Sequence, residues 1–484
     1  MARNKDQSPP RFRGPIGHCS AEELRAALTW PPPGTGRLST RLAGSLRELI
    51  RGGGLPSGTG LPPSRSVAAA LRVSRGVVVT AYDQLITEGF LDARQGAGTW
   101  VGTAIETPPG PPPSAPAPVA RPGLPDLGDF PRSRWLAAYR HALSSMGSAD
   151  LGYGDPRGHS GLRTELAGHL RRTRSAVAEA DGILIINGVA EGLALLADVL
   201  LDSGRATVAV EDPASPGARD LLARRGLEVV GIPVDEAGMD VARIKSPERL
   251  GAIFLTPAHQ YPTGVVLSPE RRRALIELAR RHDLVLIEDD YDGSFRFDRE
   301  PVGCLQGLAS DVTVLLGSVS KTLAPALRLG WLIGPRALQE RLVERRVITN
   351  LAGQTVDQLA LAHLLRSGTY DKHVRQMRRT YHARRRELIV ELANKAPNVV
   401  VCGDSSGLHL LAEVPSPAHE RVVLSVLRAD GFAVQGLAEC RLGGVSGRTS
   451  GLVIGFASLK SAALTRLADL VGQVCSGTGP VADF

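Results

Sequence analysis

The chain has little of several residue types, and each shortage narrows its class. No stretch approaches the ~20 apolar residues of a membrane-spanning helix, and the polar, Pro-bearing start lacks the apolar core of a secretory signal. Aromatic residues make up only 4%, although the hydrophobic content of 43% is ordinary for a globular protein. The five cysteines are scattered and form no metal-type pair, so we expect reduced thiols, a cytoplasmic location and no metal. A length of 484 residues predicts two to four domains.

Lysine is also scarce, which draws attention to Lys321 in the sequence SVSKTL. It follows an apolar strand predicted at 312–316 and is flanked by Ser318 and Ser320, with Arg328 seven residues further on. A Schiff base to an aldehyde phosphate cofactor needs such a group, because the amine attacks the aldehyde while hydroxyls and a guanidinium hold the phosphate. The alternative is an ordinary surface lysine after a strand.

A second polar group fits the same ligand. Four apolar residues at 284–287 predict a buried parallel strand, and Asp289 and Tyr291 follow at its carboxyl end, the edge where ligands of open α/β sheets collect. Asp289 is suited to pair with a protonated pyridine nitrogen, and Tyr291 to hydrogen-bond a ring oxygen. For the neighbouring acids we expect a solvated loop of Glu288, Asp290 and Asp292.

From about residue 123 to the C-terminus, these motifs resemble a fold-type-I, aminotransferase-like domain that binds pyridoxal phosphate (PLP). The resemblance implies an internal aldimine at Lys321, a mostly parallel sheet and a smaller α+β subdomain at about 372–480. In the turn INGVAEG, the backbone N–H groups of Val189 and Ala190 would receive the phosphate at a helix N-terminus. Tyr261, in QYPTG, stands where aminotransferases usually carry Asn. Tyr153 resembles the tyrosine that reaches the partner subunit's phosphate, and a structural tyrosine is an equal alternative.

Two departures from the aminotransferase pattern concern the substrate. Val453 stands where an arginine usually grips the α-carboxylate of the substrate, and Ser215 stands where an aromatic ring usually stacks on the pyridine. Loss of bidentate carboxylate recognition should weaken the binding of ordinary α-amino acids. Arg441 and Arg448 are close to Val453 in sequence only.

The N-terminal quarter has its own organisation and much of the basic surplus. The net charge is +8, and residues 1–110 carry 13 Lys and Arg against 8 Asp and Glu, which favours an anionic partner. We expect a helix over 39–52, a second from Ser64 and a third from Ser74 to Gly89. A Gly-tipped hairpin over 90–101 follows, and three helices with a hairpin make a winged helix-turn-helix.

The segment LPPSRSVAAALRVSRGVVVTAYDQLITEGFLDARQGAGTWV resembles the GntR-family DNA-binding domain. The resemblance implies that Arg65 contacts phosphate or a base edge, and that Arg75 reads guanine from the start of the recognition helix. The other DNA-binding residues that it implies are Ser74, Gly76 and Val77 at the same helix start, and Gln95 and Gly96 at the wing tip. We expect a flexible arm over 1–36, the winged helix over 37–103, and an aminotransferase-like domain over 123–484.

A Pro-rich linker is predicted over 104–122. A winged helix joined in this way to an aminotransferase-like domain resembles the MocR/GabR-type transcription regulators. That family implies a homodimer, an operator with repeated half-sites, and an effector that is either PLP itself, as in PdxR-like regulators of vitamin B6 synthesis, or an amine or amino acid. The alternatives are an active aminotransferase that carries a DNA-binding domain, and a DNA-binding module with the PLP fold as a dimerisation scaffold.

Overall fold

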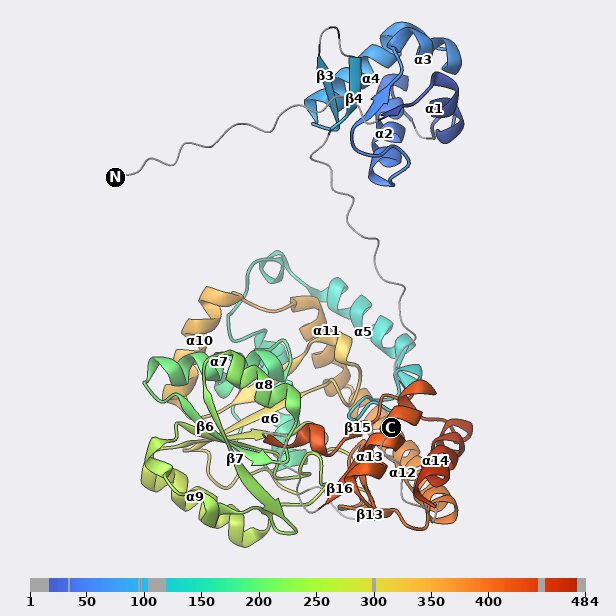
Figure 1. Cartoon of the computed structure of the whole chain (residues 1–484). Coiled ribbons are helices and arrows are strands. Elements are labelled where there is room, and N and C mark those ends of the chain that lie inside the picture. Colours follow the sequence, from blue (N-terminus) through green and yellow to red (C-terminus); the bar gives the residue numbers. More distant parts are fainter. Residues whose placement is uncertain are drawn as a thin grey trace, which may run out of the picture. The chain divides into compact units, whose positions relative to one another are not determined.

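A computed structural model describes residues 17–33, 35–94, 96, 98–102, 119–297, 302–442 and 449–476. The chain divides into two compact units, Met1–Ala115 and Pro116–Phe484, which we call the N-terminal and the C-terminal unit (Figure 1). Gln95, Arg448 and most of the predicted Pro-rich linker lie outside the described residues. No helix in the described part of the chain is long and apolar enough to cross a membrane.

The N-terminal unit is a small helical domain with a four-stranded sheet of order β1-β2-β4-β3. Its helices are α1 (Ala21–Ala27), α2 (Leu38–Arg51), α3 (Ser64–Leu71) and α4 (Arg75–Thr87), and its strands are β1 (Gly17–His18), β2 (Thr59–Leu61), β3 (Leu91–Arg94) and β4 (Gly98–Val101). The apolar faces of all four helices meet in one core, to which Leu42, Val67 and Leu85 contribute. Strands β3 and β4 pair in antiparallel register and form the predicted wing.

Helix α1 and strand β1 fall within the predicted flexible arm. Ser20 accepts a hydrogen bond from the Glu23 amide at 3.2 Å, and the Glu23 carboxylate accepts one from the Ser20 amide at 2.8 Å, so a capping box fixes the start of α1. Leu24 and Leu28 are buried in the core of the N-terminal unit. The described residues from Gly17 onward therefore belong to the folded unit, and the prediction of a flexible arm does not hold for them.

The C-terminal unit is built on an eight-stranded sheet of order β5-β12-β11-β10-β9-β6-β7-β8. Five neighbouring strands, from β11 to β7, pair in parallel, and β12 and β8 run antiparallel to their neighbours. The strands are β5 (Ile183–Ile186), β6 (Thr207–Asp212), β7 (Glu228–Asp235), β8 (Gly238–Met239), β9 (Ala252–Leu255), β10 (Val285–Asp289), β11 (Thr313–Ser318) and β12 (Gly330–Ile333).

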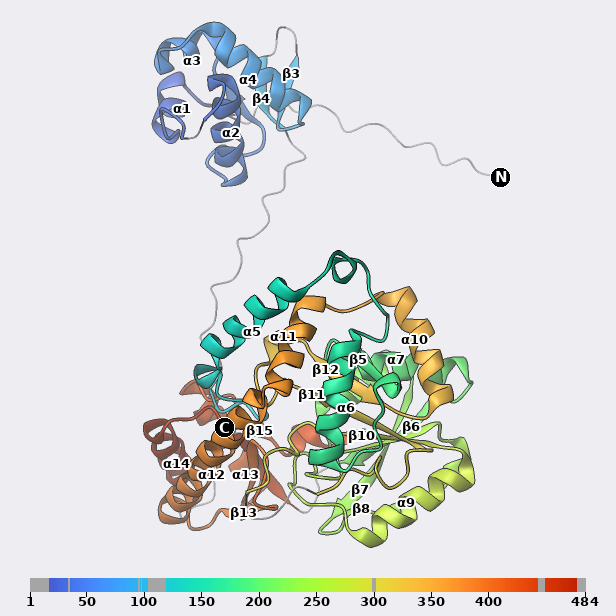
Figure 2. The same ribbon diagram turned by 180° about the vertical axis from the view of Figure 1, so that it is seen from behind.

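Helices cover both faces of this sheet, because its central strands are apolar on both sides. Along β5, Leu184 and Ile186 pack with one helical layer, and Ile183 and Ile185 pack with the other. Figure 1 shows α7 and α8 in front of the sheet, and Figure 2 shows α6 in front of it from the opposite side. The helices of the two layers and their borders are α5 (Arg132–Ser145), α6 (Ser160–Arg174), α7 (Val189–Asp202), α8 (Pro216–Arg224), α9 (Pro269–His282), α10 (Arg336–Thr349) and α11 (Thr355–Arg366).

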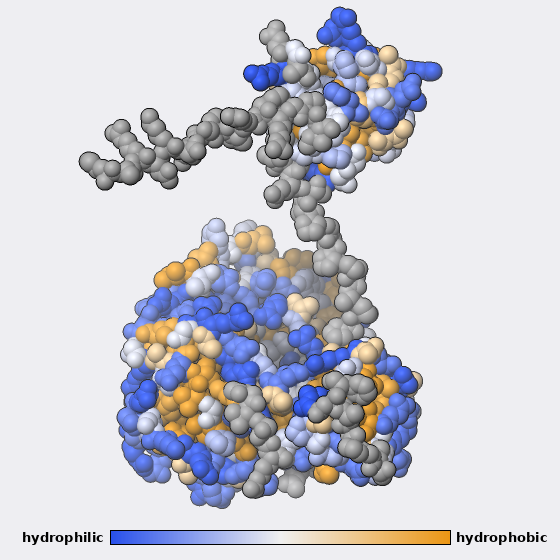
Figure 3. Space-filling model, viewed as in Figure 1, coloured by the Kyte–Doolittle hydropathy of each residue, from blue (hydrophilic) through white to orange (hydrophobic). Residues whose placement is uncertain are grey.

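A smaller α+β layer adjoins the large sheet. An antiparallel sheet of order β13-β14-β16-β15 packs on helices α12, α13 and α14 around one apolar core. Its elements are α12 (Thr369–Lys395), β13 (Val400–Cys402), β14 (His409–Val414), α13 (Pro417–Ala429), β15 (Gln435–Gly436), β16 (Ser450–Gly455) and α14 (Ser461–Cys475). The two layers confirm the predicted fold class. The visible face is mostly hydrophilic with apolar areas on the C-terminal unit (Figure 3).

The last residues of the predicted linker are part of this smaller layer. Val119 forms a parallel bridge with Phe432, and Ala120 is fully buried in the core of the layer. Folded structure therefore begins by residue 119 in the C-terminal unit, several residues before the predicted end of the linker at 122.

Candidate functional site

One cavity of about 620 Å³ lies where the large sheet meets the smaller layer. Four of the predicted cofactor-binding residues line it together, and they come from separate places along the chain: Tyr261, Asp289, Tyr291 and Lys321. Asp289 ends β10, and Lys321 follows the neighbouring parallel strand β11. Because parallel strands end at the same edge of a sheet, the two side chains reach one site.

The Lys321 amine is held in an enclosed setting. Burial lowers its pKa, which favours the neutral, nucleophilic form, while the nearby Asp289 carboxylate opposes this effect. Gly123 lies directly against it: a Cβ atom at this residue would come within 3.1 Å of Lys321 Nζ, and its φ is +69°. The backbone at Gly123 therefore forms one wall beside the amine.

The carboxyl group of Asp289 has a buried oxygen that could accept a hydrogen bond or form an ion pair. Its Oδ1 is buried and makes no hydrogen bond within the described residues. Burial raises the pKa of Asp289 to about 7, with the Lys321 charge acting in the opposite direction. A cation such as the protonated pyridine nitrogen of PLP would satisfy this oxygen, so the donor set fits that cofactor.

The predicted phosphate-binding groups are not among the residues that line the cavity; they come from the start of α7 and from the segment around Lys321. Arg328 donates to the carbonyl of Asn187 at 2.6 Å, and a Cβ atom at Gly188 would meet the Arg328 guanidinium at 3.1 Å. Val189 and Ala190 open α7, where first-turn amides have no acceptor within the helix and can bind an anion. The remaining two are at the end of β11: Ser318, its last residue, is buried, and the amide of Ser320 donates to Ser318 Oγ at 3.3 Å.

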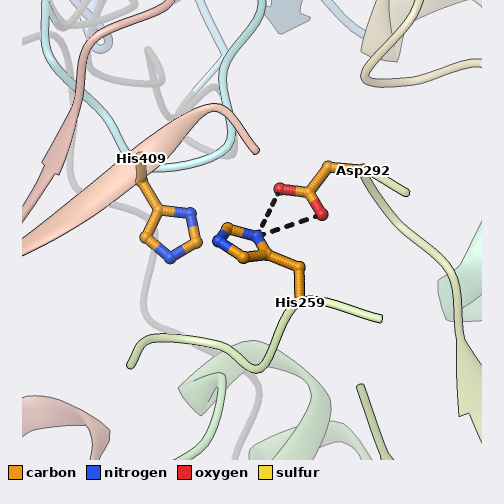
Figure 4. Close-up of side chains that lie close together, drawn as sticks. All are labelled: His259, Asp292 and His409. Carbon is orange, nitrogen blue, oxygen red and sulfur yellow. Dashed lines mark hydrogen bonds and ion pairs between the residues drawn. The ribbon is translucent and has the colours of Figure 1, made fainter. Parts of the chain in front are cut away.

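Behind Tyr291 lies a buried cluster of polar side chains, drawn in Figure 4. The Tyr291 hydroxyl donates to the His259 carbonyl at 3.0 Å, and His259 Nδ1 faces both Asp292 oxygens at 3.0 and 3.2 Å. His409 lies beside His259, with 5.1 Å between the ring centroids and an angle of 44° between the ring planes. The ligand atoms of the two histidines and Asp292 lie within 4.8 Å of one another. The short approach of Asp292 to His259 is that of a hydrogen-bonded pair, which describes the cluster without an ion.

The acids around Asp289 are not solvated, and our prediction for them was wrong. Glu288 is fully buried and accepts a hydrogen bond from the Gln306 amide at 3.0 Å. Asp290 pairs with the buried Arg174 at 2.6 Å, and Asp292 is 3% exposed. The loop after β10 is therefore a buried electrostatic network that supports the edge of the site.

The two departures in the substrate region have different surroundings. Ser215 lines the cavity at the start of α8, so no aromatic ring covers the cofactor from that position. Val453 is fully buried in an apolar cluster with Leu411, Leu437 and Cys440, and it does not line the cavity. Tyr153 is 83% exposed and is likewise not part of the lining, so it takes no part in the cavity of its own chain.

The predicted DNA-binding residues gather at the helix-turn-helix. Arg65, Ser74, Arg75 and Gly76 are exposed, and Arg75 Nε donates to Ser64 Oγ at 3.4 Å, so the starts of α3 and α4 are adjacent. Val77 differs, because its side chain packs on the core of the unit and leaves its backbone as the available contact. Gly96, at the exposed wing turn, has a φ of +85°, which favours glycine.

Several residues of the site were missed from the sequence. Arg121 and Glu211 line the cavity, and Thr256 donates from its amide and its hydroxyl to Glu211 at 3.0 and 2.7 Å. Burial raises the pKa of Glu211 to about 7. His259 and His409 are 150 residues apart in sequence. The sequence offered one local indication of this histidine cluster, which is that His259 directly precedes the motif QYPTG.

Comparison with known proteins agrees with this two-part organisation. Residues 38–101 match the model for bacterial regulatory proteins of the gntR family, and residues 126–471 match aminotransferase class I and II. The HTH-type pyridoxine biosynthesis transcriptional regulator PdxR of Corynebacterium glutamicum is 34% identical over 432 residues, which cover 87% of this chain and 92% of that protein. The probable rhizopine catabolism regulatory protein MocR of Rhizobium meliloti is 32% identical, over 80% of this chain and 83% of that protein.

Solved structures share the fold of the C-terminal unit. An archaeal alanine:glyoxylate aminotransferase superposes with a TM-score of 0.68 at 22% identity, and Pyrococcus horikoshii kynurenine aminotransferase with 0.67 at 21%. Each comparison covers 75% of this chain and 91% of the other. The chain belongs to the MocR/PdxR-type family of helix-turn-helix transcriptional regulators, in which a GntR domain is joined to an aminotransferase class I and II domain.

Proposed function

We propose that this transcriptional regulator binds PLP covalently at Lys321 and uses it to sense PLP itself or an amine or amino-acid effector. The observation that carries the proposal is the convergence of Lys321 and Asp289 in one cavity, where burial lowers the pKa of the amine and the carboxyl group keeps a buried oxygen with no hydrogen-bond partner among the described residues. PLP supplies an aldehyde that reacts with amines. Burying a charged group without a partner costs free energy of folding. An unpartnered carboxylate in a cavity is therefore expected where a ligand supplies the partner.

Individual residues divide the work of holding the cofactor. Asp289 would bind the pyridine nitrogen, while Arg328 and the amides of Val189 and Ala190 would hold the phosphate. Tyr291 and Tyr261 would contact the ring, and hydrogen bonds to His259 and Gln435 fix their hydroxyls. Ser318 and Ser320 would also contribute to the phosphate site.

The same geometry argues against turnover as the main role. A working aminotransferase, the alternative, needs a firm hold on its substrate, yet Val453 lies in an apolar cluster and Ser215 leaves the ring uncovered. The intact Lys321 and Asp289 leave a slow half-reaction chemically feasible. A keto acid released from an amino acid by the PLP-loaded protein would establish it.

We further propose a homodimer that binds repeated half-sites in the cytoplasm. Both views place α5, the turn after it and the end of α10 on one side of the C-terminal unit (Figures 1 and 2). Exposed apolar residues occur along these segments: Leu136, Leu143, Leu151, Tyr153 and Ile348. Burying such residues against a second copy would stabilise a dimer, and a two-fold dimer would read two half-sites.

The test is a joint titration of the full chain with PLP, pyridoxal and a panel of amino acids. Cofactor absorbance and the affinity for a DNA fragment selected by the protein are followed in the same samples. We expect PLP to give a new absorbance band in the wild type and none in Lys321→Ala. A wild type without the band, or a variant that keeps it, would exclude the cofactor role.

A further inference from the structure

The cavity contains one arginine that has no partner. Three cations line it: Arg121, Lys321 and Arg428. Arg428 forms an ion pair with Glu439, which lines the same cavity, and Lys321 is the amine of the cofactor site. The Arg121 side chain makes no hydrogen bond or ion pair with any residue that the structure describes. It is therefore the cation available to an anionic group inside the cavity.

Among the residues that the structure describes, no other nearby arginine is equally placed. Val453, where the aminotransferase-like pattern carries arginine, is sealed among apolar side chains. Arg441 turns away and donates to the carbonyl and the hydroxyl of Thr449 at 3.2 and 3.0 Å. Arg219 donates to the Arg441 carbonyl at 2.9 Å. None of these groups lines the cavity, whereas Arg121 does.

The backbone that carries Arg121 is fixed, although its side chain is exposed. The Ala433 amide donates to the Val119 carbonyl at 2.6 Å, and the Gly455 amide donates to the Ala120 carbonyl at 3.0 Å. Gly455 lets this segment lie flat on β16, since a Cβ atom there would come within 2.3 Å of the Arg121 carbonyl oxygen. We call residues 119–123 the strap. Its residues Arg121, Pro122 and Gly123 line the cavity, and Gly123 lies next to the Lys321 amine.

The charge of Arg121 acts on the reactive end of the cavity. Burial contributes most to the low pKa of Lys321, and the Arg121 charge adds to the same effect. Burial likewise raises the pKa of Tyr261, while Arg121 acts against that rise. A positive charge that both residues feel is close enough to attract the acidic end of a ligand whose amine reaches Lys321.

We propose that Arg121 binds the carboxylate of an amino-acid effector whose amino group reaches the cofactor at Lys321. The proposal rests on the proposed function and narrows the effector to a compound with both an amine and a carboxylate. A guanidinium suits this task because it can bind a carboxylate with two parallel hydrogen bonds. In the sequence, the strap directly follows the Pro-rich segment that comes after the winged helix.

The test compares amino acids with their own amides on the PLP-loaded full chain. Glycine, β-alanine and γ-aminobutyrate, each beside its amide, are titrated against the cofactor absorbance, and the acid-to-amide affinity ratio is measured at one pH. We expect a ratio of roughly 10 or more for at least one pair in the wild type, as for one charge-assisted hydrogen bond. In Arg121→Gln the ratio should fall to about 1.

Two further variants serve as controls for the role of the Arg121 guanidinium. Arg121→Lys should keep part of the ratio, because it keeps the charge and loses the planar fork. Arg441→Gln, outside the cavity, should keep all of it. The favoured acid should also change DNA affinity in the wild type and not in Arg121→Gln. A wild type that prefers no acid, or a ratio that persists in Arg121→Gln, overturns the assignment while the cofactor role stands. A wild type without cofactor absorbance overturns both.

Discussion

Replacing His409 by glutamine should make the C-terminal unit less sensitive to acid. The imidazole is 1% exposed, and burial, followed by the nearby His259, lowers its pKa from the ordinary 6.5 to about 3. The Asp292 carboxylate and the Pro262 carbonyl favour the protonated imidazole and raise its pKa. Burial, His259 and the Lys321 charge act in the opposite direction and outweigh them. His409 is thus neutral in the folded protein throughout the pH range in which most proteins are studied.

The direction of the pH effect follows from the protonation of His409 in the folded and in the unfolded chain. Between pH 6.5 and pH 3 the unfolded chain binds a proton at His409 that the folded chain does not bind, so stability is lost as the pH falls through this window. At pH 7 the loss is close to zero. At pH 5, about 1.5 units below the unfolded pKa, it amounts to about 2 kcal/mol at ~1.36 kcal/mol per unit.

The assay is urea unfolding of the wild type and His409→Gln at pH 7 and pH 5. Glutamine does not titrate, so the fall in unfolding free energy between the two pH values should be about 2 kcal/mol smaller in the variant. Glu211, Glu288 and Asp289, whose pKa burial raises to about 7, titrate in both proteins and cancel in the comparison. Equal pH dependence in the two proteins would refute the account of His409 as a buried, neutral imidazole.

Three substitutions, one of them with a matched control, test the other residues of the two sites. Asp289→Asn removes the carboxylate that would pair with the pyridine nitrogen of PLP. Because breaking a buried ion pair costs ~3–5 kcal/mol, PLP affinity measured by absorbance should fall at least ~100-fold. An unchanged affinity would contradict the pairing. Gly123→Ala should weaken PLP attachment by about 10-fold, since its Cβ would crowd the Lys321 amine. Gly368→Ala is its matched control, with a φ of +67° and no atom within 4 Å, and should leave attachment intact. Arg75→Ala should reduce DNA affinity at least ~10-fold in a binding assay while PLP absorbance persists; a loss of both would point to misfolding.

The features that could be predicted from the sequence are those that depend on local residue patterns. The third helix, expected from Ser74 to Gly89, is observed as α4, since a hydroxyl residue and a glycine mark its two ends. The apolar runs before Asp289 and Lys321 became neighbouring parallel strands. Their polar residues met at one edge because strand ends coincide there.

What the sequence did not give depends on contacts between distant segments. Asp290 and Asp292 are acidic residues in the loop after β10, and only the buried Arg174 and His259 beside that loop explain why they are not solvated. Residues 119–122 of the strap were assigned to the linker because that segment is rich in proline, whereas their position is set by hydrogen bonds to Ala433 and Gly455. Helix α1 escaped notice because seven residues carry little periodic signal.

The central claim is that occupancy of Lys321 controls binding to DNA. The most direct measurement is the affinity of the full chain for its selected DNA fragment, with and without PLP, in the wild type and in Lys321→Ala. The account predicts that PLP changes the affinity of the wild type and leaves that of the variant unchanged. An equal response in the two proteins, or no response in the wild type to PLP with any of the amines, would contradict it.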